Sequence, residues 1–303
     1  MADWQSGIVE ANGIRLHYTR TGGEGPPLVL AHGVTDDGLC WTPVAATLQG
    51  EYDVIMVDAR GHGQSDAPES GYDAATQAAD LHGLIVGLGL NKPALLGHSL
   101  GAATTLVLAG LYPNVPGAIL LEDPPGWWAA PPEWRTGEDE SAGTRASTVI
   151  HGRTNADDER LIGMQAWFSG LKQKTREQLI AEQRSATPGW SEAELGPWAD
   201  SKLRVSSNVL DVFNPGTPRS VDWPDVLRHI TCPALLITAD PARGAVLKED
   251  AAAALQVLVP HLRIAHIAEA GHNVRREQFD RYIEVVRAFL AEWSGSGAKG
   301  SGA

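Results

Sequence analysis

The chain has 303 residues, of which 43% are hydrophobic and 20% charged, and its formal net charge at pH 7 is −13. These proportions predict a globular protein, and no apolar run reaches the roughly 18 residues that a membrane span needs. Nucleic acid and anionic membranes repel such a negative chain, so neither is expected as the main partner. The N-terminus has no basic segment followed by an apolar stretch, which favours a cytoplasmic protein.

The first elements expected along the chain are two antiparallel strands. Residues 8–10 and 14–18 alternate in polarity around Asn12-Gly13, a dipeptide that suits the tight turn of a hairpin. Short, unbroken apolar runs follow, and such runs are typical of strands that are buried on both faces. They comprise residues 28–31, 54–58, 94–96, 118–121, 234–238 and 264–267.

Helical patterns lie between several of these runs. They comprise residues 74–88, 102–111, 247–258 and 278–293. The alternation of strand and helix predicts an α/β fold with a mostly parallel, eight-stranded sheet and helices on both faces. We expect residues 1–123 and 231–293 to form this core.

The segment 124–230 interrupts the alternation and is expected to be an inserted helical cap. It has no clear buried strand, and its helical stretches are amphipathic. Tryptophans are concentrated in it, and they either pack the cap onto the core or form an apolar roof over a pocket. These are Trp127, Trp128, Trp134, Trp167, Trp190, Trp198 and Trp223.

Two further features are expected to carry no function. Residues 294–303 are rich in glycine and serine and resemble a flexible linker or tag, too poor in apolar side chains to pack. Cys40 and Cys232 lie far apart without the spacing of metal ligands, and we expect two reduced thiols.

The most informative motif is Gly97-His98-Ser99-Leu100-Gly101, which follows an apolar run and precedes a helical pattern. This Gly-x-Ser-x-Gly pattern is typical of a nucleophile elbow, in which a strained turn presents a serine at the end of a strand. Small residues around the serine let the following helix approach closely. Ser99 is therefore the candidate nucleophile.

Together with this motif, His32-Gly33, residues 58–65 and Gly271-His272 occur in an order that resembles the α/β-hydrolase fold superfamily. The resemblance covers roughly residues 8–123 and 231–293, with a cap domain between them. Because position 99 is serine, the chain departs from the branches with an aspartate nucleophile, the haloalkane dehalogenases and epoxide hydrolases. Esterases, lactonases, amidases, carbon–carbon bond hydrolases and perhydrolases remain.

The resemblance implies a catalytic triad in the chain order serine, acid, histidine. His272 lies in the loop before the last helix and is the expected general base. Asp240 ends an apolar run and is the preferred acid that orients this base. Glu122 and Asp123 are the alternative acids, because some relatives carry the acid at the end of that earlier strand.

The resemblance also implies an oxyanion hole formed by two backbone amides, those of Val34 and Leu100. His32 is expected to make a structural hydrogen bond rather than to transfer a proton. The segment from Asp58 to Asp66 contains glycines and charges, but it matches no phosphate-binding motif. We expect it to be a structural turn.

These residues predict a serine hydrolase that cleaves a carboxylic ester or a related acyl bond through an acyl-enzyme. The substrate is expected to be a small molecule, with Trp127, Trp128 and Trp167 as possible pocket residues. Neither a cofactor nor a metal is expected, since no cluster of histidine, cysteine and carboxylate has ligand spacing. Lactones, amides and carbamates are alternative substrates; acyl transfer, perhydrolysis and a receptor without turnover are alternative functions. The sequence leaves the oligomeric state open.

Overall fold

The computed structural model describes residues 4–129, 155–214 and 220–297. The chain begins with the expected hairpin, which consists of strands β1 (Gln5–Ala11) and β2 (Ile14–Arg20). Its turn places Asn12 at φ 49° and Gly13 at φ 79°. Asparagine and glycine tolerate this left-handed conformation, which explains why they join the two strands.

The hairpin lies at one edge of an eight-stranded sheet with the order β1-β2-β4-β3-β5-β6-β7-β8. β2 pairs antiparallel with β1 and β4, and the strands from β3 to β8 are parallel to one another. The mostly parallel sheet predicted from the sequence is therefore confirmed. The other strands are β3 (Pro27–Ala31), β4 (Asp53–Val57), β5 (Ala94–His98), β6 (Ala118–Glu122), β7 (Ala234–Thr238) and β8 (Arg263–His266).

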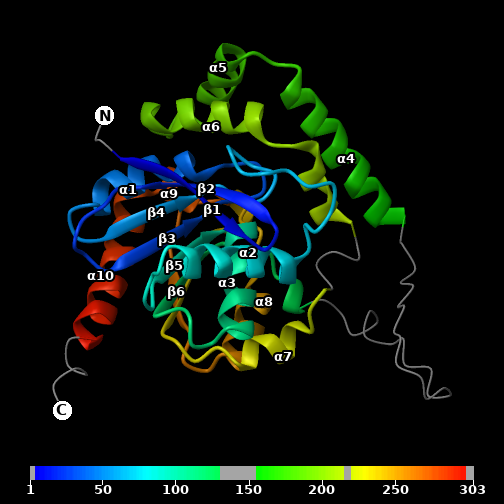
Figure 1. The fold of residues 1–303 in the computed structure, drawn as a ribbon. Coiled ribbons are helices and arrows are strands. Elements are labelled where there is room, and N and C mark those ends of the chain that lie inside the picture. The colour runs from blue at the N-terminus through cyan, green and yellow to red at the C-terminus, as the bar shows by residue number, and fades with distance from the viewer. Residues whose placement is uncertain (1–3, 130–154, 215–219, 298–303) are drawn as a thin grey trace.

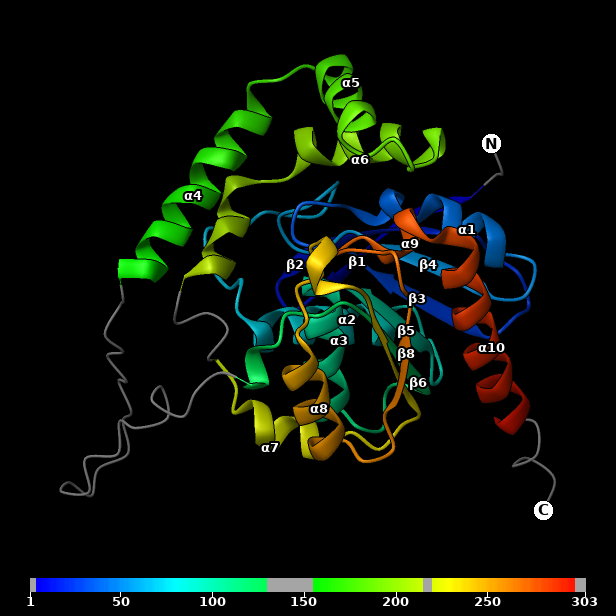
Figure 2. The same cartoon turned by 180° about the vertical axis from the view of Figure 1, so that it is seen from behind.

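Helices cover both faces of the sheet, as Figures 1 and 2 show. One apolar layer lies between the sheet and helices α2, α3 and α8, and a second lies between the sheet and α1 and α10. A short 3₁₀ helix, Gly38–Trp41, leads into α1. The bounds are α1 (Thr42–Leu48), α2 (Ala74–Gly87), α3 (Leu100–Leu111), α8 (Glu249–Leu258), α9 (Val274–Glu277) and α10 (Phe279–Gly297).

Three helices lie together outside the sheet, at the top of Figure 1. They are α4 (Asn155–Lys172), α5 (Arg176–Ala186) and α6 (Glu192–Arg204), and a 3₁₀ helix, Ser207–Phe213, follows them. Leu171, Leu179 and Ala199 form a small apolar cluster among the three helices. These helices lie within the segment for which the sequence predicts a helical cap, and residues 130–154 and 215–219 of that segment lie outside the described parts.

The last part of the predicted cap packs with the core instead. Helix α7 (Trp223–Arg228) buries Trp223 and Leu227 in the apolar layer that contains α3 and α8. Ile230 and Trp128 belong to the same layer. Boundaries at 124 and 230 are therefore too wide, because both ends of the insertion carry large apolar side chains that cover the core helices.

The sequence also predicted the start of the flexible tail too early, at residue 294. Helix α10 continues to Gly297, and the Ser294 hydroxyl donates a hydrogen bond to the Ala291 carbonyl. Backbone hydrogen bonding propagates a helix beyond its last apolar residue, which composition alone does not reveal. Residues 298–303 lie outside the described parts. Within the described parts, no helix is both long and apolar enough to cross a membrane, and both cysteines are buried free thiols.

Candidate active site

Ser99 occupies the sharp turn between β5 and α3. Its backbone has φ 52° and ψ −116°, a strained conformation for a residue with a side chain. The Ser99 N–H donates to the Glu122 carbonyl on β6 over 2.9 Å. A Cβ atom on Gly101 would lie only 2.2 Å from the carbonyl oxygen of Ala31, so glycine allows α3 to approach β3. This is the geometry expected of a nucleophile elbow.

His272 reaches Ser99 from the loop between β8 and α9. Its Nε2 lies 3.0 Å from the Ser99 Oγ, within hydrogen-bond distance. The Glu277 carboxylate accepts hydrogen bonds from the N–H groups of Gly271, over 2.8 Å, and Asn273, over 3.2 Å. The backbone on both sides of His272 is therefore held by one side chain, which fixes where the imidazole lies.

Asp123 contacts the other side of the His272 ring. Its Oδ2 lies 2.6 Å from the His272 Nδ1, and the Asp123 side chain is fully buried. The N–H of Val246 donates to Oδ2 over 2.8 Å, and that of Leu247 donates to Oδ1 over 3.0 Å. Three groups thus contact this carboxylate and hold it against the His272 ring.

The structure corrects the choice of Asp240 as the acid that contacts His272. Asp240 Oδ1 lies 3.0 Å from the His266 Nε2, and its Oδ2 accepts the N–H of Glu269. The reason is sheet order: β6 is the neighbour of β5, whereas β7 lies one strand further from Ser99. Asp123 directly follows β6 and is therefore closer to His272. The other alternative acid, Glu122, pairs with Arg275.

His98 is a buried residue of this site whose contact was not predicted. Its Nε2 lies 2.8 Å from the His272 carbonyl oxygen, so the ring donates this hydrogen bond and links β5 to the loop that carries His272. Burial lowers the pKa of His98 well below its ordinary value, which keeps the ring neutral. The only available signal was its place beside Ser99, and many residue types occupy that position.

The backbone around Val34 and Leu100 has the features of an anion-binding site. Leu100 is the first residue of α3, where N–H groups have no partner within the helix. Within the described parts of the chain, no hydrogen bond engages the N–H of either Val34 or Leu100. A Cβ on Gly33 would lie 2.9 Å from the His98 ring and 3.4 Å from the Ser99 Cβ. Glycine at position 33 thus lets the loop pack against Ser99.

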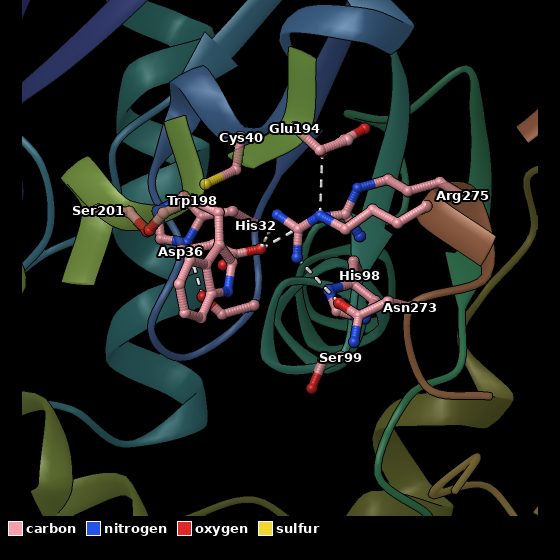
Figure 3. Close-up of polar contacts among 12 residues, drawn as sticks. His32, Asp36, Cys40, His98, Ser99, Glu194, Trp198, Ser201, Asn273 and Arg275 are labelled. Atoms are coloured by element: carbon pink, nitrogen blue, oxygen red, sulfur yellow. Dashed lines mark hydrogen bonds and ion pairs between the residues drawn. The ribbon is translucent and has the colours of Figure 1, made fainter. Parts of the chain in front are cut away.

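Beside this loop lies a buried carboxylate, Asp36, with three cationic partners. Lys202 Nζ lies 2.7 Å from Oδ1, while Arg275 Nη2 and Arg276 Nη2 lie 3.0 and 2.9 Å from Oδ2. Figure 3 shows Asp36 and Arg275 gathered beside His98 and Ser99. Burial alone would raise the pKa of Asp36, but these cations hold it well below its ordinary value.

The same network joins the cap to the core. Arg276 Nε lies 3.0 Å from Glu194 on α6, and Arg275 Nη1 lies 3.2 Å from Glu122 on β6. Since Lys202 is also on α6, one cap helix contributes a cation and an anion to a cluster that includes the loop after Val34. The network contains three cations and three carboxylates, so its formal charges balance, as buried ions require.

Lys202→Met provides a test of this network. Methionine retains much of the side-chain volume but leaves Asp36 with the two arginines alone. We expect the free energy of unfolding to fall by about 3 kcal/mol, the lower end for breaking a buried ion pair. Arg184→Met removes an exposed pair with Glu192 and is expected to lower the free energy of unfolding far less, because solvent screens exposed ion pairs. Urea unfolding measures both, and equal losses would contradict the role of the network.

His32 makes the structural hydrogen bonds expected of it. Its Nε2 accepts the N–H of Ala59 over 3.0 Å, and its Nδ1 therefore donates to the Gly33 carbonyl over 2.8 Å. Burial, assisted by the neighbouring His62, lowers the pKa of His32 to about 4. Both nitrogens are engaged by the neutral ring, so protonation would break the bond to Ala59.

This burial predicts an acid-dependent loss of stability. Below its ordinary pKa of about 6.5, His32 binds a proton in the unfolded chain but stays neutral in the folded one until about pH 4. The contribution of His32 to the free energy of unfolding is therefore fully present above pH 6.5. It falls by about 3 kcal/mol as the pH drops toward 4. Urea unfolding at pH 7.5 and 4.5 measures how far the free energy of unfolding falls between these two values, and His32→Gln is expected to make that fall smaller. The exposed His229→Gln should leave it unchanged.

The predicted pocket tryptophans lie in different surroundings. Trp128 is 3% exposed, and its Nε1–H donates to the Ala251 carbonyl of α8, so the structure places it in the core rather than in a pocket. Its fixed indole bond and its apolar neighbours explain this correction. Trp127 lies next to Trp223, with ring centroids 5.8 Å apart. Trp167 on α4 is 45% exposed. A pocket role for Trp127 and Trp167 stays a prediction.

Comparison with known proteins identifies the family. A family model described as the alpha/beta hydrolase fold matches residues 26–275. A 2-(acetamidomethylene)succinate hydrolase of Mesorhizobium japonicum is 38% identical over 274 residues, which cover 89% of this chain and 90% of the relative. An N-formylmaleamate deformylase of Pseudomonas putida is 28% identical over 298 residues, which cover 94% of this chain and 96% of the relative.

Solved structures show the same fold. A crystal structure of E-2-(acetamidomethylene)succinate hydrolase has a TM-score of 0.73 at 23% identity and covers 95% of this chain and 99% of its own. The crystal structure of an enol-lactonase from Burkholderia xenovorans has a TM-score of 0.70 at 21% identity. It covers 94% of this chain and 100% of its own. Family model, relatives and fold agree, and the chain belongs to the α/β hydrolase fold family of enzymes.

Proposed function

We propose that the protein is a serine hydrolase that cleaves an acyl bond of a small molecule through an acyl-enzyme. The observation that carries this proposal is the continuous chain of contacts from Ser99 to His272 over 3.0 Å and from His272 to Asp123 over 2.6 Å. A serine hydroxyl is a weak nucleophile near neutral pH, and it needs a base oriented by a third group. These three residues supply that combination.

In the first half of the reaction, His272 Nε2 takes the proton of Ser99 as the Oγ attacks the acyl carbon. Asp123 accepts the Nδ1–H, which holds the ring in the tautomer with a free Nε2 and stabilises the imidazolium that forms. The imidazolium then gives its proton to the leaving alcohol or amine. An ester links Ser99 to the acyl group at this stage, and water activated by His272 removes it in the second half.

The negative charge that develops on the acyl oxygen is assigned to the amides of Val34 and Leu100. The N–H of Leu100 opens helix α3, whose N-terminus favours an anion. Gly33 lets the loop that carries Val34 approach the nucleophile. Each donor of this kind is worth about 10²- to 10³-fold in kcat.

The relatives bear on which acyl bond is cleaved. The sequence favours a carboxylic ester, because an alkoxide leaves more readily than an amide nitrogen. Two relatives that match nearly the whole chain are named instead for N-formylmaleamate and 2-(acetamidomethylene)succinate, both of which are N-acyl compounds. N-acyl amides of small carboxylic acids are therefore the second class of substrate, and the triad serves both.

A matched substrate panel separates these classes. An ester, a lactone and an amide with the same acyl group are compared with the two compounds for which the relatives are named, and kcat/KM is measured for the unaltered protein and for Ser99→Ala. We expect turnover of at least one member, and its loss in the variant. Stoichiometric binding of a compound without repeated turnover would instead support a receptor. Product ratios with added alcohol or peroxide test acyl transfer and perhydrolysis.

A further inference from the structure

A second arrangement of serine, histidine and aspartate lies at the hairpin edge of the sheet. The Ser6 Oγ lies 2.6 Å from the Nε2 of His17, and the Nδ1 of His17 lies 2.8 Å from the Oδ2 of Asp58. These distances match those at Ser99, where the corresponding values are 3.0 and 2.6 Å. Three strands, β2, β4 and β3, separate β1 from β5, so the two arrangements are independent.

Hydrogen bonds fix the protonation pattern of this second arrangement. Asp58 accepts the N–H groups of Gly38, over 2.7 Å, and Gln64, over 2.9 Å. Burial alone would raise the pKa of Asp58, but the bonds from His17 and these amides lower it below its ordinary value. An ionised Asp58 accepts the Nδ1–H of His17, which leaves the Nε2 lone pair to accept the Ser6 O–H.

The environment differs between the base and the nucleophile. His17 and Asp58 are 5% and 4% exposed, whereas Ser6 is exposed on the edge strand β1. The buried pair therefore holds its geometry, and the hydroxyl is open to a reagent. Asp58 and the bond from the Ser65 hydroxyl to the Asp58 carbonyl stabilise the turn predicted for this segment. That structural role does not require Ser6.

We propose that Ser6 is a second acyl-accepting hydroxyl, activated by His17 and Asp58, which takes a single acyl group from an activated carboxylic ester. The Ser6 oxygen forms a bond to the acyl carbon, and the bond from that carbon to the leaving oxygen breaks. The Ser6 proton passes to His17 Nε2 and from there to the leaving alkoxide. No oxidant, metal or other co-reactant is needed.

The site is expected to accept an acyl group without turning over. A positioned general base contributes about 10²- to 10⁴-fold. Ser6 lies within a strand rather than at a helix N-terminus. The exposed amide of Gln64 contacts the same imidazole, with its Nε2 3.3 Å from His17 Nε2. A strand offers no helix N-terminus with unpaired N–H groups to stabilise the oxyanion, so hydrolysis of the acyl-serine is expected to be slow and the ester to persist.

The experiment uses the full chain with Ser99→Ala, so that its result does not depend on the proposed function. The protein is treated with 4-nitrophenyl acetate, digested with trypsin and mapped by mass spectrometry. Ser6 is the only serine in the peptide that ends at Arg15. Release of the acetyl group by hydroxylamine identifies an ester and separates it from acetylated amines. The exposed Ser185 on α5 reports the reactivity of an ordinary serine in the same sample.

We expect Ser6 to be acetylated about 100-fold faster than Ser185. The additional replacement His17→Gln should bring Ser6 down to the rate of Ser185, and circular dichroism checks that this variant is folded. Equal rates at Ser6 and Ser185 in the protein that retains His17 would overturn the proposal, whether or not the His17 variant folds. An unchanged Ser6 rate in a folded His17→Gln protein would overturn it as well.

Discussion

Replacing Ser99 with alanine is expected to lower kcat for an activated aryl ester by about 10⁶-fold while leaving the protein folded. The hydroxyl is the attacking group, and no other described side chain bonds to the Nε2 of His272. Alanine is smaller than serine and has the same backbone requirements, so the strained turn is retained. Stopped assays at high protein concentration measure the residual rate.

His272→Gln is the matched variant for this prediction. Because base and nucleophile act as one unit, it should lose nearly as much activity as Ser99→Ala, and the double variant should lose hardly more. Losses that multiplied in the double variant would mean that the two residues act independently. Activity close to that of the unaltered protein in Ser99→Ala would remove Ser99 from the mechanism.

Asp123→Asn is expected to lower kcat by about 10⁴-fold. The asparagine amide can present an N–H to the His272 Nδ1, which favours the tautomer whose Nε2 carries the proton and cannot accept that of Ser99. Asp240→Asn should change kcat less than about tenfold, because Asp240 is bonded to His266 and to the N–H of Glu269. The same aryl ester assay serves for both variants.

The comparison of these two carboxylates is decisive because the substitution is the same. A collapse of activity in Asp240→Asn with little change in Asp123→Asn would require His272 to turn away from its present partner during the reaction. Thermal unfolding of both proteins controls for stability, since Asp123 also accepts the N–H groups of Val246 and Leu247.

The sequence was sufficient to predict that Ser99 and His272 lie in contact. Ser99 and His272 are far apart along the chain, yet each lies in a local pattern with few interpretations: a strand, turn and helix for Ser99, and a loop before the last helix for His272. The short apolar runs likewise predicted the buried strands β3 to β7, because a strand covered on both faces needs few polar positions. The run at 264–267 was wrongly expected to be buried: β8 is the edge strand of the sheet, and most of its side chains are exposed.

The acid could not be chosen from the sequence alone. Asp123 and Asp240 each end or follow an apolar run, and only the sheet order shows that β6 lies beside β5. The decisive contacts, from Val246 and Leu247 to Asp123, come from backbone N–H groups, which every residue except proline has. Such contacts leave no trace in residue type.

The buried charge network was equally inaccessible to sequence reasoning. Asp36 and Lys202 belong to the core and the cap, and nothing in the local pattern of either predicts burial. Charged residues are exposed in most proteins, which favours a solvated position for each taken singly. Their burial becomes visible only when helix α6 is placed over the loop after Val34.

The most direct test of the central claim is to trap the acyl-enzyme. The protein is mixed with excess 4-nitrophenyl ester, quenched in acid within the first turnover, digested and mapped by mass spectrometry, while the burst of nitrophenol is recorded. We predict a burst of about one equivalent per chain and an acyl group on Ser99, both absent in Ser99→Ala. Steady turnover with no burst and no acyl group on Ser99, at times when product is already forming, would contradict the account.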